Sequence, residues 1–145
     1  MNFDELRKRG SRLVVAAIVA TLVLEMMMQV GAPRILGIAP LSPANLITNI
    51  LALPQGHIVG VIAHFGLGLI AFPLGYMIIA FRHFPGGPLL RGALWGVLLW
   101  LVAMAVVVPL AGMPFFFSFG MPMVAALVAH IVYGVILAAI VGDPG

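Results

Sequence analysis

The sequence has no cysteine and few charged residues, and both shortages narrow the class of protein. Without cysteine, the chain cannot form a disulfide, a thiolate zinc site, an iron–sulfur cluster or a covalently attached c-type haem. Charged residues make up 8% of the 145 residues, whereas hydrophobic residues make up 63%. A soluble globular domain could not bury so much apolar surface, so the composition predicts an integral membrane protein.

Acidic residues and hydroxyl nucleophiles are also scarce, which argues against an enzyme. Glu25 is the only acidic residue that lies away from the ends of the chain. No second carboxylate is therefore available beside it for general acid–base chemistry. None of the serines has a histidine and an acid nearby in the sequence, as a nucleophilic triad would require, and we predict no catalytic residue.

Four apolar runs are long enough to cross the hydrocarbon core as helices. They cover residues 12–31, 57–80, 89–111 and 121–142. We expect a single all-α integral membrane domain over residues 1–145, with four transmembrane helices. In the first loop, "LSPANLITNILALP" has Ser42 as a helix cap and Pro43 at the first helical position, which predicts a short interfacial helix.

Basic residues lie mostly on one side of these predicted helices. One group precedes the first run, Arg82 and Arg91 flank the second loop, and only Arg34 lies on the other side. Because cytoplasmic loops are enriched in lysine and arginine, both termini are expected in the cytoplasm of a bacterial inner (plasma) membrane. The formal charge of +3 is thus interpreted as a topology signal, and no nucleic-acid partner is expected.

Two short phrases occur twice. "VIAHFGLG" in the second run corresponds to "LVAHIVYG" in the fourth, and "RGSRLVVAA" in the first corresponds to "RGALWGVLL" in the third. This pattern suggests two parallel helix-hairpin repeats. Pro73 and Pro109 lie inside the second and third runs and should kink those helices unless packing compensates.

The repeated histidines mark the candidate site. His64 and Gly68 lie on one helical stripe, and His130 and Gly134 lie on another, because residues four apart share a face. At about 1.5 Å per residue, both histidines and Glu25 lie at a similar depth in the outer half of the membrane. A carboxylate in hydrocarbon is costly unless it is neutral, paired or faces a cavity, so Glu25 is a functional candidate.

Several roles are open to these residues. Each imidazole can hydrogen-bond across a tightly packed helix pair. Alternatively, His64 and His130 can hold a b-type haem, the leading cofactor candidate, with Gly68 and Gly134 making room for the macrocycle. His64, His130 and Glu25 are also the ligands of a possible iron or zinc site. Further alternatives are a copper site built from outward methionines, and a histidine–glutamate pair that binds a quinone or relays a proton.

Long stretches of the chain resemble known membrane proteins. "HFGLGLIAFPLGY", "PLLRGALWGVLLWLVAMAVVVPLAGM" and "AHIVYGVILAAIVG" are similar to small four-helix bacterial inner-membrane proteins in families of unknown function. The resemblance covers most of the chain and implies the four-helix architecture, but it supplies no activity and no functional residue.

Two functional hypotheses follow from the sequence. With almost no extramembrane domain, the chain is expected to be a non-catalytic subunit in the lipid bilayer. It would pack against a larger respiratory or photosynthetic complex, or against copies of itself. The alternative is an electron-transfer protein that binds haem or another redox cofactor or metal through His64 and His130.

Overall fold

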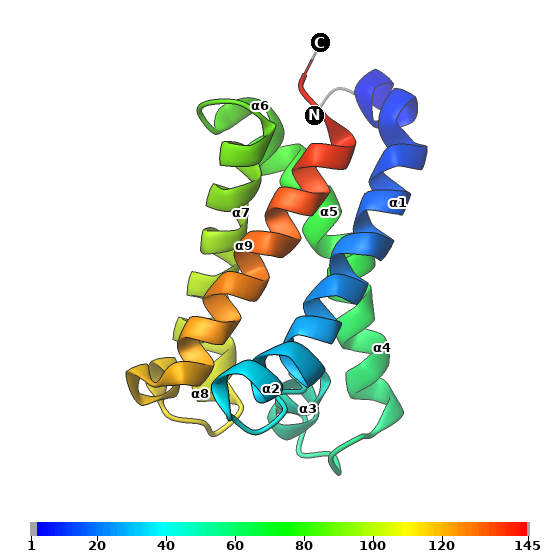
Figure 1. The fold of residues 1–145 in the computed structure, drawn as a ribbon. Coiled ribbons are helices and arrows are strands. Elements are labelled where there is room, and N and C mark those ends of the chain that lie inside the picture. The colour runs from blue at the N-terminus through cyan, green and yellow to red at the C-terminus, as the bar shows by residue number, and fades with distance from the viewer. Residues whose placement is uncertain (1–2, 145) are drawn as a thin grey trace.

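Four long helical segments run from one end of the molecule to the other (Figure 1). The computed structural model describes residues 3–144. The segments Arg7–Leu36, Ile58–His83, Pro88–Leu110 and Met121–Val141 are each long and apolar enough to cross a membrane. This confirms the expected all-α membrane fold, although the first segment extends beyond the predicted span at both of its ends.

The first three spans are divided into shorter helical segments, and the fourth is one continuous helix. The first span contains α1 (Phe3–Met26), η1 (Met27–Gly31) and α2 (Ala32–Leu36). The second contains α4 (Ile58–Gly66), η2 (Leu67–Ala71), α5 (Phe72–Gly75), η3 (Tyr76–Ala80) and α6 (Phe81–His83). The third contains α7 (Pro88–Val102), η4 (Ala103–Val107) and α8 (Val108–Leu110), and the fourth is α9 (Met121–Val141). The loops carry α3 (Pro43–Ile50) and the turn η5 (Phe115–Phe119).

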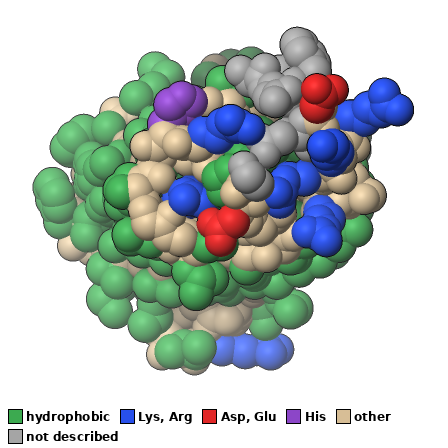
Figure 2. Space-filling model, turned by 90° about the horizontal axis from the view of Figure 1, so that it is seen from above, with side chains coloured by type: hydrophobic (Ala, Val, Ile, Leu, Met, Phe, Trp, Pro, Cys, Tyr) green, Lys and Arg blue, Asp and Glu red, His purple; other side chains and the backbone are tan. Residues whose placement is uncertain are grey.

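The two ends of the bundle differ in charge. Both chain ends and α6 lie at one end, here called the terminal end, whereas α2, α3 and α8 lie at the opposite, loop end (Figure 1). Seen from the terminal end, lysine and arginine side chains gather within a surround of hydrophobic side chains (Figure 2). Arg34 lies in α2, at the loop end. The charge asymmetry expected from the sequence is therefore present in the fold.

Helix α9 lies between α7 and α1 and packs against both (Figure 1). Its contact with α7 depends on glycines. A Cβ atom added at Gly92 or Gly96 would meet the backbone carbonyl of Gly134 or of His130, and one added at Gly134 would meet the carbonyl of Gly92. The two backbones therefore touch directly, as small residues permit between membrane helices.

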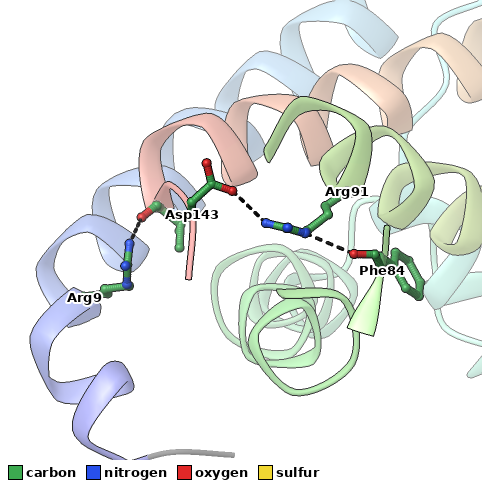
Figure 3. Close-up of polar contacts among 5 residues, drawn as sticks. Arg9, Phe84, Arg91 and Asp143 are labelled. Carbon is green, nitrogen blue, oxygen red and sulfur yellow. Dashed lines mark hydrogen bonds and ion pairs between the residues drawn. The ribbon is translucent and has the colours of Figure 1, made fainter. Parts of the chain in front are cut away.

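Two arginines from different spans hold the C-terminal end of α9 (Figure 3). Arg9 Nη1 donates a hydrogen bond of 2.7 Å to the carbonyl of Val141. Arg91 Nη1 lies 2.8 Å from Asp143 Oδ1, and its Nε donates to the carbonyl of Phe84 at 3.1 Å. Cations at this position satisfy terminal carbonyls and interact favourably with the helix dipole. The arginine of each repeated Arg-Gly phrase thus contacts the chain at the C-terminal end of α9.

The prolines in the spans are accommodated by π-helical turns. Segments η1, η2 and η4 each end two residues before Pro33, Pro73 and Pro109, respectively. In each turn the residue before the proline donates its N–H five residues back, to the carbonyl of Met27, Leu67 or Ala103. A π-helical turn would continue with the proline donating five residues back, to the carbonyl of Met28, Gly68 or Met104. Because proline has no N–H, each of these carbonyls lacks that donor.

Two of these three carbonyls receive a donor from elsewhere in the protein. The Met28 carbonyl accepts the backbone N–H of Leu41 at 3.3 Å, and the Gly68 carbonyl accepts the hydroxyl of Tyr133 at 2.7 Å. The third is the carbonyl of Met104. The prolines therefore create tertiary contacts as well as local distortion, as the absence of water in hydrocarbon requires.

The predicted interfacial helix is present as α3 and packs on α4 through Gly60. A Cβ atom at Gly60 would meet the Thr48 side chain and the Ala44 carbonyl. The side chain of Asn45 also accepts the N–H of Gly56 at 2.9 Å, which ties α3 to the start of the second span. Ser42 occupies the N-cap position and Pro43 the first turn, as expected, but the Ser42 side chain makes no capping hydrogen bond.

The glycine contact predicts a matched pair of alanine variants. Gly134→Ala should lower the free energy of unfolding by about 2 kcal/mol, because its new methyl group must displace the α7 backbone. Gly10→Ala should leave stability unchanged or raise it by up to about 1 kcal/mol, because no atom lies within 4 Å of its added Cβ. Unfolding in mixed micelles with increasing denaturing detergent measures both. Equal stability of the two variants would contradict the backbone contact.

Candidate functional site

Glu25 of α1 and His64 of α4 form a pair inside the bundle. Glu25 Oε1 contacts His64 Nε2, and the two side chains are only 19% and 10% exposed. Gln29, one turn further along the first span, donates from Nε2 to the other carboxylate oxygen at 3.4 Å. Each oxygen of this intramembrane carboxyl group therefore has a polar neighbour, which offsets the cost of placing it in hydrocarbon.

The pair can hold one proton without carrying net charge. The proton can reside on His64, giving an ion pair, or on Glu25, giving two neutral groups. Removing it leaves a single negative charge, and adding another leaves a single positive charge.

His130 is close to this pair but is oriented by its own helix. Its Nδ1 lies 2.7 Å from the carbonyl oxygen of Ala126, one turn earlier in α9. A carbonyl oxygen can only accept, so Nδ1 carries the hydrogen, and Nε2 of the neutral ring is left as an acceptor. His130 therefore presents a defined tautomer, an arrangement also typical of histidines that bind metals.

A cavity of about 140 Å³ joins the two histidines. His64 and His130 both line it, together with apolar side chains that include Leu24, Phe72 and Met104. Toward the loop end, the lining continues onto α3 and onto Phe117 of η5. The cavity therefore extends from the buried polar residues to α3 and η5 at the loop end.

The η5 turn that carries Phe117 has an unusual backbone. Phe116, Phe117 and Ser118 have φ values of +49°, +48° and +54°, in the left-handed region that residues with a side chain rarely occupy. The ring of Phe116 packs edge-on against Trp100 at 5.4 Å. This contact anchors the turn to the third span, and Phe117 contributes to the cavity wall.

Gly68 and Gly134 do not line the cavity. The space above Gly68 is occupied by Thr21 of α1, whose Oγ1 lies 2.7 Å from the position a Cβ would take. Gly134 faces the backbone of α7 at Gly92. Both glycines thus serve helix packing, and the two histidine stripes do not face each other across an open slot.

This geometry does not fit a haem between the two histidines. His64 Nε2 is engaged by Glu25, and the glycines expected to make room are covered. The cavity is also smaller than the roughly 300 Å³ at which pockets for larger organic ligands begin. Nor do residues 3–144 contain a group of three or more His, Cys, Asp or Glu side chains that could hold a metal ion. Glu25, His64 and His130 are neighbours, but they do not complete a metal centre.

The other two histidines have local roles. His57 caps α4, since its Nδ1 accepts the N–H of Val59 at 3.2 Å. His83 is exposed near the terminal end, with Nδ1 3.1 Å from the carbonyl of Ile79. Neither residue lines the cavity.

The fold and the site define a multi-pass α-helical membrane protein with a buried acid–base pair beside a small cavity. The comparisons with known proteins agree with this class and add a family. The chain belongs to DUF6789, a family of unknown function, which matches residues 8–143. No curated protein and no solved structure matches the chain.

The sequence analysis missed two residues of this region, Tyr133 and Phe117. Tyr133 is buried, and its hydroxyl donates to the Gly68 carbonyl. The sequence signals only that Pro73 leaves a carbonyl about one turn earlier without its donor. The π-helical register that makes this the Gly68 carbonyl is visible only in the fold. Phe117 has no comparable signal, since its position depends on the left-handed turn.

The Tyr133 bond can be tested against the other tyrosine. Tyr133→Phe should lower the free energy of unfolding by about 1 kcal/mol, because the Gly68 carbonyl loses its donor. Tyr76→Phe should cost less or stabilise, because the buried Tyr76 hydroxyl has no hydrogen-bond partner among the described residues. The same detergent unfolding assay applies. A larger loss for Tyr76→Phe than for Tyr133→Phe would show that the assignment is wrong.

Proposed function

We propose that this protein is a non-catalytic subunit of a larger respiratory or photosynthetic complex in the bacterial inner membrane, with both termini in the cytoplasm. In this proposal, the Glu25–His64 pair is a proton-exchanging site within the hydrocarbon core. The contact between these two side chains is the observation that carries the proposal. Intramembrane ionisable residues are costly, and paired carboxylates and histidines commonly serve proton transfer.

The surroundings of the pair support exchange with one side of the membrane. The cavity beside His64 reaches α3 and η5 at the loop end, whereas the interior toward the terminal end is filled by buried side chains such as Tyr76, Phe81 and Trp95. A proton that enters from the loop end can therefore reach the pair, which in this proposal stores or donates it.

The proposed partner is inferred from the groups beside Glu25 and from an apolar groove on the surface. The two side chains that contact the Glu25 carboxylate are His64 and Gln29. In this proposal, a proton held there is used by another protein chain. An apolar groove of about 270 Å³ between the end of the first span and the start of α9 offers a surface for lateral contact, and Val128 lines it.

Titration of Glu25 tests the proton site. Replacing His64 with Gln should change the pH midpoint at which the Glu25 carboxyl group titrates, because the carboxylate loses its contact with Nε2. Infrared spectroscopy of the carboxyl group measures this midpoint. His83→Gln is the control and should leave the midpoint where it is. An unchanged midpoint in folded His64→Gln protein would overturn the proposal.

Co-isolation from native membranes tests the partner. In mild detergent, the protein should purify in fixed stoichiometry with the same set of membrane proteins. Val128→Trp should reduce that recovery, because it fills the groove, whereas Ile62→Trp is a matched exposed substitution on α4 outside it and should not. Recovery of only a monomer or self-oligomer would remove the support for a subunit role in a larger complex.

A further inference from the structure

The cavity beside His64 and His130 has the size of one small ring. Its volume is about 140 Å³. An engineered cavity of about 150 Å³ lined by apolar side chains binds benzene, which sets the scale for a single six-membered ring. The rings of Phe72 and Phe117 are part of the lining, so aromatic surface is available to contact such a ligand.

The polar chemistry of this cavity favours a ligand that donates hydrogen bonds. The bond between His130 Nδ1 and the Ala126 carbonyl leaves Nε2 as an acceptor. His64 Nε2 is already engaged by Glu25, whereas the His130 ring keeps Nε2 as an acceptor and lines the same cavity. A ligand with only carbonyl or ether oxygens would place an acceptor against an acceptor.

A second acceptor comes from the π-helical turn in the third span. The N–H of Val108 donates to Ala103, and Pro109 has no N–H, so the Met104 carbonyl lacks both donors that would normally follow it in a helix. Met104 is buried and lines the same cavity. The corresponding carbonyls of Met28 and Gly68 each accept a hydrogen bond from a residue outside their own helix, so a carbonyl at this position calls for an external donor.

We propose that the cavity binds a single hydroxylated six-membered ring, whose hydroxyl group donates to His130 Nε2. The reduced headgroup of a membrane quinol and a free phenol share this chemistry. A para-hydroxylated ring has a further hydroxyl for the Met104 carbonyl. Entry is from the loop end, between α3 and Phe117. This inference concerns ligand binding alone and does not depend on proton exchange at Glu25.

Phenol and its methyl ether, anisole, are a matched pair that tests the proposal. They share the ring and differ in the hydroxyl donor. Isothermal titration of the full chain in detergent, corrected with a detergent-only blank, should give saturable binding of one phenol per chain. Anisole should bind about tenfold more weakly, because its oxygen cannot donate. Equal binding of phenol and anisole, or no saturable phenol binding, would overturn the proposal.

Variants identify the atoms involved. His130→Leu should abolish the preference for phenol over anisole, whereas His83→Leu, a matched substitution outside the cavity, should retain it. Ala103→Leu places bulk in the cavity lining and should weaken both ligands, which keeps the test informative if the His130 variant does not fold. A phenol preference that survives in folded His130→Leu protein would exclude His130 as the acceptor and overturn the assignment.

The source of the ring is distinguished by its tail and its redox state. A decyl-substituted quinol that binds more tightly than the tailless quinol, after correction for partitioning into micelles, indicates a membrane quinol. Equal affinity indicates a free phenolic compound. In either case the corresponding quinone, measured under anaerobic conditions, should bind more weakly, since it has no hydroxyl to donate. Tighter binding of the quinone would contradict the proposal.

Discussion

The structure depends on one constraint, that a polar group within hydrocarbon must find its partner inside the protein. Prolines make this constraint visible, because each removes an N–H from a span. The π-helical turns before Pro33 and Pro73 leave single carbonyls open, and Leu41 and Tyr133 supply the missing donors. One of these bonds ties the first loop to the first span, and the other joins the second span to α9. Local defects in the helices thus become connections between them.

The same constraint organises the candidate site. Glu25 is accommodated because His64 and Gln29 approach its two oxygens, and His130 is accommodated because its imidazole bonds back to its own helix. These solutions differ in kind. The first joins two spans through a side-chain contact, whereas the second fixes a tautomer and leaves one nitrogen available. The cavity lies where these two arrangements meet, which places an acid–base pair and a hydrogen-bond acceptor beside one small apolar space.

The sequence predicted the spans, the interfacial helix and the shared depth of Glu25 and the histidines, because these follow from run length, Pro43 and helical rise. It did not predict which helix faces which. The stripes containing Gly68 and Gly134 are rich in small residues, and such stripes fit a neighbouring helix as well as a flat ligand. Only the fold shows that Thr21 and the α7 backbone occupy those positions. The position of Phe117 was equally inaccessible, since a left-handed turn at four consecutive non-glycine residues, 116–119, contradicts local preference.

The contacts that Arg9 and Arg91 make at the end of α9 bear on the order in which the protein assembles. Arg9 and Arg91 come from the first and third spans. Arg9 reaches Val141 at the end of α9, and Arg91 reaches Asp143, two residues after it. The first three spans are synthesised before α9, so until α9 is made the glycine face of α7 lacks its helical neighbour and both arginines lack these contacts. Insertion of α9 provides the neighbour and both contacts together. The two arginine contacts therefore form only when the bundle is complete. A chain that stops before its last helix is left with the glycine face of α7 uncovered inside the membrane.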